Sequence, residues 1–563
     1  MIVVELCHKL ESDWWKKSVV YQIYPKSFMD ADGDGIGDLQ GIIQKLDYLA
    51  DLGVDVLWLT PIYESPQKDN GYDISNYYAI DERYGSLEQF DLLIREAHKR
   101  SLKIIMDIVV NHTSTEHEWF KRSRQSVDNE YRDYYIWKAP KDSREPNNWE
   151  SKFGGSAWKY DEKTQQYYLH LYDETQADLN WENPAVRKNV CDIMHFWLQR
   201  GVQGFRLDVI NVISKDQDFP DDELGDGRRF YTDGPRVHEY MRELNREVFS
   251  RYDMMTVGEM SSTTIDHCIR YTRPERQELN MVFNFHHLKV DYPGGNKWEL
   301  GEFDLPGLKK ILSDWQVDMH QGEGWNALFW CNHDQPRIVS RYGCDGRYLK
   351  ESAKMLATTI HMMQGTPYIY QGEEIGMADP GFDHISDYRD VETLNMYRMM
   401  REQGKSEQEA MEIIRRRSRD NSRTPMQWDS GANAGFTTGR PWIRVAPSSS
   451  RINVEASLRD PDSVWFHYKQ LISLRKQFDI ITYGSYEPIL LDHPELFAYL
   501  RKYNNETLLV VSNFTDKQPV FEWTEASWSG TSWRILLSNY KDSKALPGNM
   551  RLRPYESIIY YGW

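Results

Sequence analysis

The sequence predicts an α/β protein built on a (β/α)8 TIM barrel, with a domain inserted after the third strand and a C-terminal antiparallel β domain. Short runs rich in β-branched and aromatic residues recur over the first two thirds of the chain, and helical patterns lie between most of them. Strands that alternate with helices favour a parallel sheet, and eight of them complete a barrel. An open, doubly wound sheet has the same rhythm and remains the alternative.

The strand-like runs come in a regular order. The first two, at residues 18–25 and 54–62, flank a helical pattern at 38–53. The third, at 102–112, follows a helical pattern at 86–101. The other five are predicted at residues 201–210, 254–260, 279–285, 326–334 and 366–376. Together they supply the strands that a closed barrel needs.

Residues 113–179 interrupt this rhythm with a segment rich in Trp, Tyr, Asn and Gly, which predicts a small irregular domain inserted into the barrel. From residue 484 onward the apolar residues alternate and no long helical pattern occurs, which predicts an antiparallel β domain at 484–563. The barrel itself is therefore expected in two parts, at residues 1–112 and 180–483.

Composition argues against several classes of protein. The chain has 563 residues and a formal net charge of -18, which argues against nucleic acid or an anionic membrane as a partner. No window approaches the roughly 18 consecutive apolar residues of a membrane span. The N-terminus shows no secretory signal, so we expect a cytoplasmic protein, as a monomer or weak homo-oligomer. Five cysteines without a CxxC pair fit reduced thiols better than disulfides or zinc.

Three acids, Asp208, Glu259 and Asp334, end strand-like runs, so a barrel brings them to one face. Arg206 lies two positions before Asp208, on the same side of the strand, where its charge keeps that carboxylate ionised and nucleophilic. Desolvation after an apolar strand raises the pKa of Glu259 toward that of a general acid. Each acid alone could equally cap the next helix. The set predicts a retaining glycosidase, whose two carboxyl groups lie about 5 Å apart.

Four segments resemble, in order and spacing, the signature regions of the α-amylase superfamily of glycoside hydrolases: DIVVNHTS, GFRLDVIN, VGEM and FWCNHDQPR. QADLNWENP resembles a fifth region, which closes the inserted domain in that family. The resemblance implies Asp208 as nucleophile, Glu259 as acid/base and Asp334 as the carboxylate that orients sugar hydroxyls. It also implies that His112, Arg206 and His333 occupy the family's sugar-binding and charge-tuning positions.

The segments DNGYDISNY and RDNSRTPMQWD resemble the oligo-1,6-glucosidases and their relatives within this family. The resemblance implies that Asp69, Tyr72 and Arg423 close the far end of a glucose pocket. A closed pocket admits one terminal glucose, so an exo-acting enzyme is expected. Val209 directly follows the expected nucleophile. In this family a valine at that position goes with α-1,6 or other non-maltose specificity. The alternative is that it is an ordinary β-branched strand residue with no role in substrate binding.

The stretch DADGDGIGDLQG places Asp30, Asp32, Asp34 and Asp38 close together, with the Ile36 carbonyl available as a further oxygen for a hard cation. It is not an EF-hand, because Gly41 stands where the bidentate Glu should be. An acidic turn without an ion is the alternative. Similarity to the calcium loop of the oligo-1,6-glucosidases favours a structural calcium ion, and no organic cofactor is expected.

The stretch FNFHHLKVDYPGGNKW concentrates basic side chains in an acidic protein. It and several other segments, including GDGRRFYTDGPRVHEYM, resemble the members of the family that act on a phosphorylated disaccharide. The resemblance implies hydrolysis of the α,α-1,1 bond of trehalose 6-phosphate to glucose and glucose 6-phosphate. The candidate phosphate ligands are Lys289 and Lys297, supported by His286 or His287. Solvated loop charges near Asp291 and Glu299 are the alternative.

Two other functions fit parts of the sequence. An oligo-1,6-glucosidase acting on isomaltose and short isomaltooligosaccharides would use the same catalytic and pocket residues. A catalytically inactive transporter subunit or sugar-binding module would carry a membrane helix and lack the carboxylates, whereas all three acids are present here. Sucrose isomerases and transglucosylases share the scaffold, and the sequence leaves the partition between hydrolysis and transfer open.

Overall fold

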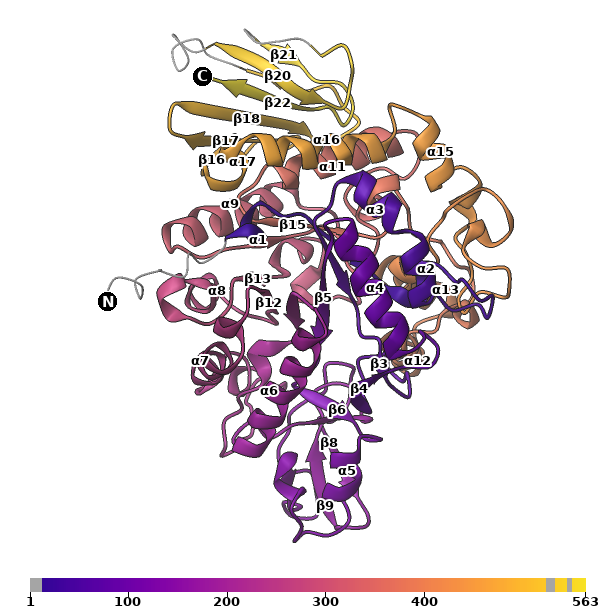
Figure 1. The fold of residues 1–563 in the computed structure, drawn as a ribbon, viewed down its shortest axis with the longest axis vertical. Coiled ribbons are helices and arrows are strands. Elements are labelled where there is room, and N and C mark those ends of the chain that lie inside the picture. The colour runs from indigo at the N-terminus through magenta and orange to yellow at the C-terminus, as the bar shows by residue number, and fades with distance from the viewer. Residues whose placement is uncertain (1–12, 523–531, 544–548) are drawn as a thin grey trace, which may run out of the picture.

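The computed structural model describes residues 13–522, 532–543 and 549–563, and its centre is a barrel of eight parallel strands (Figure 1). The strands are β1 (Val20–Ile23), β2 (Val56–Leu59), β5 (Lys103–Ile108), β11 (Gly204–Leu207), β12 (Met255–Glu259), β13 (Met281–Phe283), β14 (Ala327–Leu328) and β15 (Thr366–Tyr370). They follow one another around the barrel in sequence order, and β15 pairs with β1. A single parallel bridge between Val282 and Asn326 joins β13 to the start of β14. The predicted barrel is confirmed, and the open sheet is excluded.

Helices cover the outside of the barrel. The main ones are α2 (Leu39–Gln44), α3 (Leu46–Leu52), α4 (Leu87–Lys99), α6 (Pro184–Gln199), α7 (Val237–Glu247), α8 (Ile265–Thr272), α9 (Leu305–Gln321) and α11 (Leu349–His361). The helical pattern at 38–53 forms two helices, which meet at Lys45. The second ends at Gly53, whose φ of 97° suits a residue without a Cβ. Because side chains fill the interior and helices cover the exterior, every residue of β1 is buried.

The inserted domain follows β5 and lies at the end of the long axis opposite the C-terminal sheet (Figure 1). Its two ends are joined by the antiparallel pair β6 (His112–Ser114) and β10 (Gln176–Asp178). Between them lie α5 (Glu118–Ser123) and the three-stranded sheet formed by β7 (Trp137–Lys138), β8 (Trp158–Asp161) and β9 (Gln166–Leu169). Since β5 ends at the catalytic face of the barrel, the insertion stands over that face.

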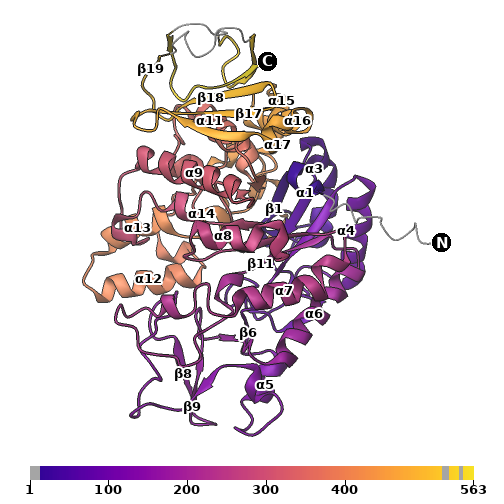
Figure 2. The same ribbon diagram turned by 90° about the vertical axis from the view of Figure 1, so that its left-hand side faces the viewer.

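A helical segment follows β15, between the barrel and the C-terminal sheet in sequence. It contains α12 (Val391–Glu402), α13 (Glu407–Arg417) and the short α14 (Asp420–Arg423). Helices α12 and α13 lie side by side on one flank of the barrel (Figure 2). The segment brings Glu392 and Arg419 to the catalytic face, where both contribute to the site described below.

The C-terminal sheet is antiparallel, in the order β16-β17-β18-β22-β20. Its strands are β16 (Ser485–Ile489), β17 (Leu496–Tyr503), β18 (Glu506–Asn513), β22 (Ser557–Gly562) and β20 (Trp533–Ser538). Successive side chains point to opposite faces. Phe497 and Tyr499 therefore pack into the main core, whereas Leu496 and Ala498 belong to a separate apolar cluster on the other face.

Within the described ranges, no helix is long and apolar enough to cross a lipid bilayer. Cys191, Cys268, Cys331 and Cys344 are free thiols, as expected for reduced cysteines, and Cys7 lies outside the described residues.

Candidate active site

A cavity of about 310 Å³ opens at the carboxyl ends of the barrel strands, beneath the inserted domain. Six of the residues singled out for catalysis and sugar binding line it: Asp69, Tyr72, His112, Asp208, Glu259 and Asp334. They come from segments nearly 270 residues apart, and the barrel brings them together because all follow its strands.

The Arg206 guanidinium lies at the centre of the site and is 1% exposed. Its Nη1 donates to Asp208 Oδ1 at 2.5 Å and to Asp107 Oδ1 at 2.8 Å. Its Nη2 lies 2.5 Å from Glu259 Oε2. One guanidinium thus holds the expected nucleophile and the expected acid/base close to each other, as expected for a retaining glycosidase, whose two carboxyl groups flank the scissile bond at short separation.

The backbone at Val209 explains how β11 delivers these groups. Arg206 and Asp208 are two positions apart and point to the same side. Val209 then turns the chain out of the strand with φ 37° and ψ 38°, a left-handed conformation that costs energy in a β-branched residue. In that conformation its N–H donates to Glu259 Oε2 at 3.1 Å. Residue 209 is therefore coupled to the acid/base through its backbone.

Burial dominates the titration of the two catalytic carboxyls. Desolvation raises the pKa of Glu259 to about 7, and the Asp208 charge adds to this rise while the Arg206 charge opposes it. Burial also raises the pKa of Asp208 above its usual range, against the same guanidinium. A carboxyl with a pKa near 7 is protonated often enough at neutral pH to act as a general acid.

Asp334 has the opposite electrostatic environment. Although burial disfavours its charge, His333, Arg419 and Arg423 hold the pKa of its carboxyl well below the usual range. Arg423 Nη2 donates to Asp334 Oδ1 at 2.7 Å, and Arg419 Nη1 donates to the same oxygen at 3.3 Å. The carboxylate is still 26% exposed toward the cavity, so a permanently charged oxygen is available to a sugar hydroxyl.

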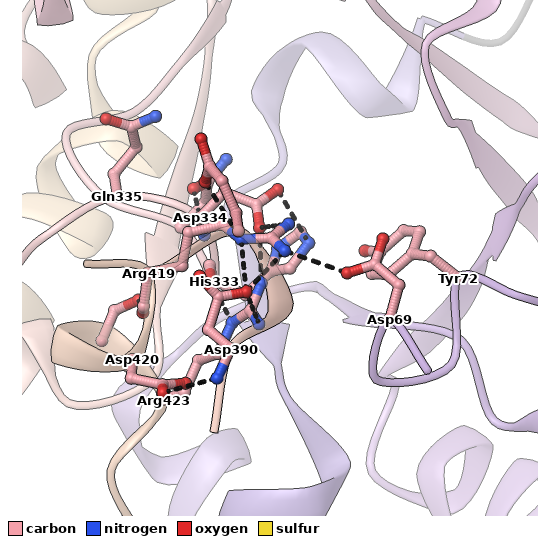
Figure 3. A network of polar contacts seen from close by, with 12 residues as sticks. Asp69, Tyr72, His333, Asp334, Gln335, Asp390, Arg419, Asp420 and Arg423 are labelled. Carbon is pink, nitrogen blue, oxygen red and sulfur yellow. Dashed lines mark hydrogen bonds and ion pairs between the residues drawn. The ribbon is translucent and has the colours of Figure 1, made fainter. Parts of the chain in front are cut away.

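The far end of the cavity is closed by an ion-pair network (Figure 3). Arg419 Nη2 lies 3.0 Å from Asp69 Oδ1 and 2.6 Å from Asp390 Oδ1. Arg419 lines the cavity. Arg423 does not; it is 1% exposed and its Nε donates to the His333 carbonyl at 2.7 Å. Arg423 therefore acts through Asp334 and the backbone, and the arginine that faces the sugar pocket is Arg419, four residues earlier in the same motif.

Tyr72 and His112 line the side of the cavity, and His333 is buried behind Tyr72. The Tyr72 ring stacks on His333 with centroids 5.1 Å apart, and its hydroxyl donates to Asp107 Oδ2 at 2.9 Å. His112 Nε2 lies 3.2 Å from the Tyr72 carbonyl oxygen. Burial lowers the pKa of His112 to about 4 and that of His333 to about 3, so both rings are neutral at physiological pH.

The basic stretch after β13 borders the cavity, but its residues differ: Lys289 lies at the other, open end, whereas Lys297 lies close to Arg419, since both contact Glu392 Oε2. Lys289 lines the cavity, and although the residue as a whole is exposed, partial desolvation of its ammonium there, together with the Arg228 charge, lowers its pKa. Lys297 also lines it, with its ammonium 2.7 Å from Glu392 Oε2. His286 lines it as well, and burial lowers its pKa to about 4, so it offers a neutral ring. His287 is buried, with Nε2 2.8 Å from the Phe329 carbonyl oxygen.

Four further charged residues line the same cavity and were not singled out from the sequence: Lys152, Arg228, Glu392 and Arg419. The acids near the basic stretch do not neutralise Lys289, since Asp291 is bound by Arg341 and Arg417. The paired arginines of GDGRRF, in an otherwise acidic loop, were the available signal for Arg228. The sequence around Lys152, in the inserted domain, contains no comparable signal.

The acidic loop before α2 brings carboxylate oxygens of Asp30, Asp32 and Asp38 within 4.8 Å of one another. Asp34 is not part of this group, and its Oδ1 instead accepts the Ile36 N–H at 2.7 Å. Clustered carboxylates repel one another unless a cation lies between them, and oxygen ligands suit calcium. The donor set therefore fits a hard divalent cation.

Residues 22–484 match the model of the alpha-amylase catalytic domain, and residues 496–559 match the alpha-amylase SusG C-terminal domain. The chain therefore belongs to the alpha-amylase family of glycoside hydrolases, and the predicted family and enzyme class are confirmed.

The chain is 63% identical over 553 residues to the trehalose-6-phosphate hydrolase of Bacillus subtilis (strain 168), with 98% of each chain covered. It is 56% identical over 559 residues to the oligo-1,6-glucosidase of Parageobacillus thermoglucosidasius, covering 98% of this chain and 99% of the relative. A crystal structure of Bacillus licheniformis trehalose-6-phosphate hydrolase superposes with a TM-score of 0.94 at 64% identity, over 98% of this chain and 99% of that chain.

Replacing the acid/base should affect leaving groups unequally. Glu259→Gln removes the proton donor, so we expect kcat/KM for a disaccharide to fall by roughly 10² to 10⁴. A 4-nitrophenyl glucoside needs little protonation and should lose less in the first step, and added azide should restore turnover by attacking the glycosyl-enzyme. The exposed Glu162→Gln serves as control. Equal losses on both substrates, without azide rescue, would contradict the assignment.

The pH dependence follows from the pKa of Glu259, which is raised to about 7. The enzyme needs this group protonated, so kcat/KM should fall as the pH rises through about 7. On the acid side of the pH profile, kcat/KM should rise as Asp208 ionises. Because the two carboxyls interact, both apparent pKa values belong to the pair rather than to either residue. An uncharged aryl α-glucoside is the substrate to measure, because it does not titrate. Activity that stays constant well into the alkaline range would contradict the assignment of Glu259.

Proposed function

We propose that this protein is a retaining, exo-acting α-glucosidase that hydrolyses trehalose 6-phosphate to glucose and glucose 6-phosphate. The observation that carries the proposal is the asymmetry of the cavity. One end is closed by the Arg419–Asp69 ion pair, at 3.0 Å, and the other is lined by Lys152, Arg228 and Lys289, whereas Lys297 shares Glu392 with Arg419. The relatives from Bacillus subtilis and Bacillus licheniformis that bear this activity in their names support it.

The geometry implies a two-step mechanism. The unphosphorylated glucose enters the closed end, where Asp334 and Arg419 face its hydroxyls. Asp208 attacks its anomeric carbon while Glu259 gives its proton to the departing oxygen, and glucose 6-phosphate leaves through the open end. Glu259 then takes a proton from water, which attacks the same carbon and releases Asp208.

The phosphate contributes to recognition through charge. A charge-assisted hydrogen bond in a partly closed site contributes about 1.5 to 3 kcal/mol, roughly ten- to over a hundredfold in affinity. Lys289 is the strongest candidate within the basic stretch, because Lys297 shares its charge with Glu392 at 2.7 Å. His286 contributes a neutral hydrogen-bonding ring rather than a charge.

A phosphorylated sugar does not cross a membrane unaided, so we infer a cytoplasmic site of action, with the phosphorylated disaccharide as the small-molecule partner. The expectation of a monomer or weak homo-oligomer stays a prediction.

An oligo-1,6-glucosidase is the second candidate, because the closed end of the cavity would bind a terminal glucose in the same way. The relative from Parageobacillus thermoglucosidasius supports it. The two functions differ at the open end, since isomaltose has no anionic group for the cations there.

The two substrates can be compared directly. We expect kcat/KM for trehalose 6-phosphate to exceed that for isomaltose and free trehalose, because only the phosphorylated sugar engages the open-end cations. Lys289→Ala should raise KM for trehalose 6-phosphate about tenfold or more relative to an aryl α-glucoside, and Lys297→Ala should have a smaller effect. If isomaltose is preferred and Lys289→Ala affects all substrates alike, the phosphate assignment is wrong.

We also propose that Asp30, Asp32 and Asp38 bind one structural calcium ion, with the Ile36 carbonyl as a further ligand. The loop is tied to the barrel region by Thr437, whose hydroxyl donates to Asp30 Oδ2 at 2.5 Å. A bound ion would relieve the repulsion within the cluster and stabilise this contact.

Calcium removal should lower thermal stability. A ligand present at 100 times its Kd stabilises a folded chain by about 2.7 kcal/mol, so chelation should lower the Tm by several degrees, and calcium should restore it. Asp32→Asn should abolish the difference in Tm between the calcium-bound and the chelated protein. Asp34→Asn should have a smaller effect on that difference. Elemental analysis should find one ion per chain. A Tm that does not respond to chelator or calcium would argue for an acidic turn without an ion.

A further inference from the structure

Lys152 is a cation that the catalytic mechanism does not use. It belongs to the inserted domain, yet its ammonium points into the active-site cavity. There Nζ donates to the hydroxyl of Ser261 at 2.5 Å, two residues after the acid/base. It also lies 5.6 Å from the ring centroids of Tyr172 and Tyr231. In the part of the chain that the structure describes, no carboxylate lies within ion-pair distance of this ammonium.

An ammonium in this position is costly for the empty enzyme. Burial, the Arg228 charge and, to a smaller extent, the Lys289 charge together lower the pKa of Lys152 to about 7, while the Glu259 and Asp178 carboxylates oppose this change. Desolvated charges are normally paired, because an unpaired one loses its hydration without compensation. A group of cations that repel one another inside a cavity is compensated when an anionic ligand arrives.

The cations converge from separate parts of the fold. Lys152 comes from the inserted domain, Arg228 from the loop after β11, and Lys289 from the loop after β13. Arg228 is 53% exposed and its ion pair with Asp226 is long, at 3.3 Å, so its charge remains available. The hydroxyls of Ser261 and Ser262 line the same part of the cavity. Cations and hydroxyl donors together match the oxygens of a phosphate group.

We propose that Lys152 and Arg228 are specificity-determining residues, which with Lys289 hold the phosphate of the leaving sugar between the inserted domain and the barrel loops. The inference rests on the proposed function and deepens it. It moves the centre of the phosphate site away from Lys297, which is bound to Glu392 at 2.7 Å. It also gives the inserted domain a direct part in selecting the substrate.

The alternative role for Lys152 is to tune Glu259, since the two charges attract each other. A tuning residue would affect every substrate that needs the acid/base. A phosphate ligand would affect phosphorylated substrates most. The ratio of kcat/KM for trehalose 6-phosphate to kcat/KM for free trehalose separates these roles, because both leaving sugars need protonation by Glu259 and only one carries a phosphate. Activity on 4-nitrophenyl α-glucoside reports that each variant is folded.

The experiment compares Lys152→Met, Lys152→Arg and Arg228→Gln with the control Lys159→Met. Lys159 lies in the same domain and forms an exposed ion pair with Glu174, at 2.7 Å. We expect the ratio to fall about tenfold or more for Lys152→Met and Arg228→Gln, less for Lys152→Arg, and not for Lys159→Met. The inhibition constant of glucose 6-phosphate, divided by that of glucose, should rise most in Lys152→Met and Arg228→Gln, less in Lys152→Arg, and not in Lys159→Met.

A ratio that stays at the parental value in both Lys152→Met and Arg228→Gln overturns the inference while leaving the proposed function in place. If the parent enzyme does not hydrolyse trehalose 6-phosphate, the proposed function fails, and glucose 6-phosphate inhibition then decides the inference alone. The inference would be overturned if glucose 6-phosphate inhibited the parent enzyme no more strongly than glucose and if none of the variants weakened that inhibition.

Discussion

The buried Arg206 guanidinium is the interaction on which the catalytic site depends. It contacts Asp107, Asp208 and Glu259, and burial raises the pKa of all three carboxyls. One positive charge cannot compensate three buried negative charges, so a proton is retained within the group at neutral pH. A retaining glycosidase needs this state, with one carboxylate free to attack and one carboxylic acid ready to donate. The arginine therefore fixes the geometry of the pair, and burial, acting against its charge, keeps the proton.

The two ends of the cavity use charge in different ways. At the closed end, Arg419 and Arg423 are balanced by Asp69, Asp334 and Asp390, so the arginines fix the position and charge of Asp334 without making the pocket strongly positive. At the open end, Lys152 and Lys289 have no such balance among the described residues. A neutral sugar suits the first environment and an anionic one suits the second. The proposed orientation of the disaccharide rests on this difference.

The barrel and its catalytic carboxylates could be predicted from the sequence because local patterns encode them. Strands buried on both faces are short apolar runs, and a polar residue at the end of such a run must lie on the catalytic face. Which arginine of RDNSRTPMQWD faces the pocket could not be predicted, because both are arginines of one short motif, and only the folded backbone places Arg419 just before helix α14 and Arg423 at its end. Pairing between Lys297 and Glu392 was equally inaccessible, since α12 supplies the partner from 95 residues away. Lys152 reaches the cavity only because the inserted domain folds back over the barrel.

The stereochemistry of the first product tests the two-step displacement by Asp208 and Glu259 most directly. Proton NMR of the glucose released early from an aryl α-glucoside, before the anomers equilibrate, distinguishes one displacement from two. Two successive displacements through Asp208 predict the α anomer as the first-formed product. Appearance of the β anomer first would mean that water attacks directly, and would contradict the role assigned to Asp208 beside Glu259.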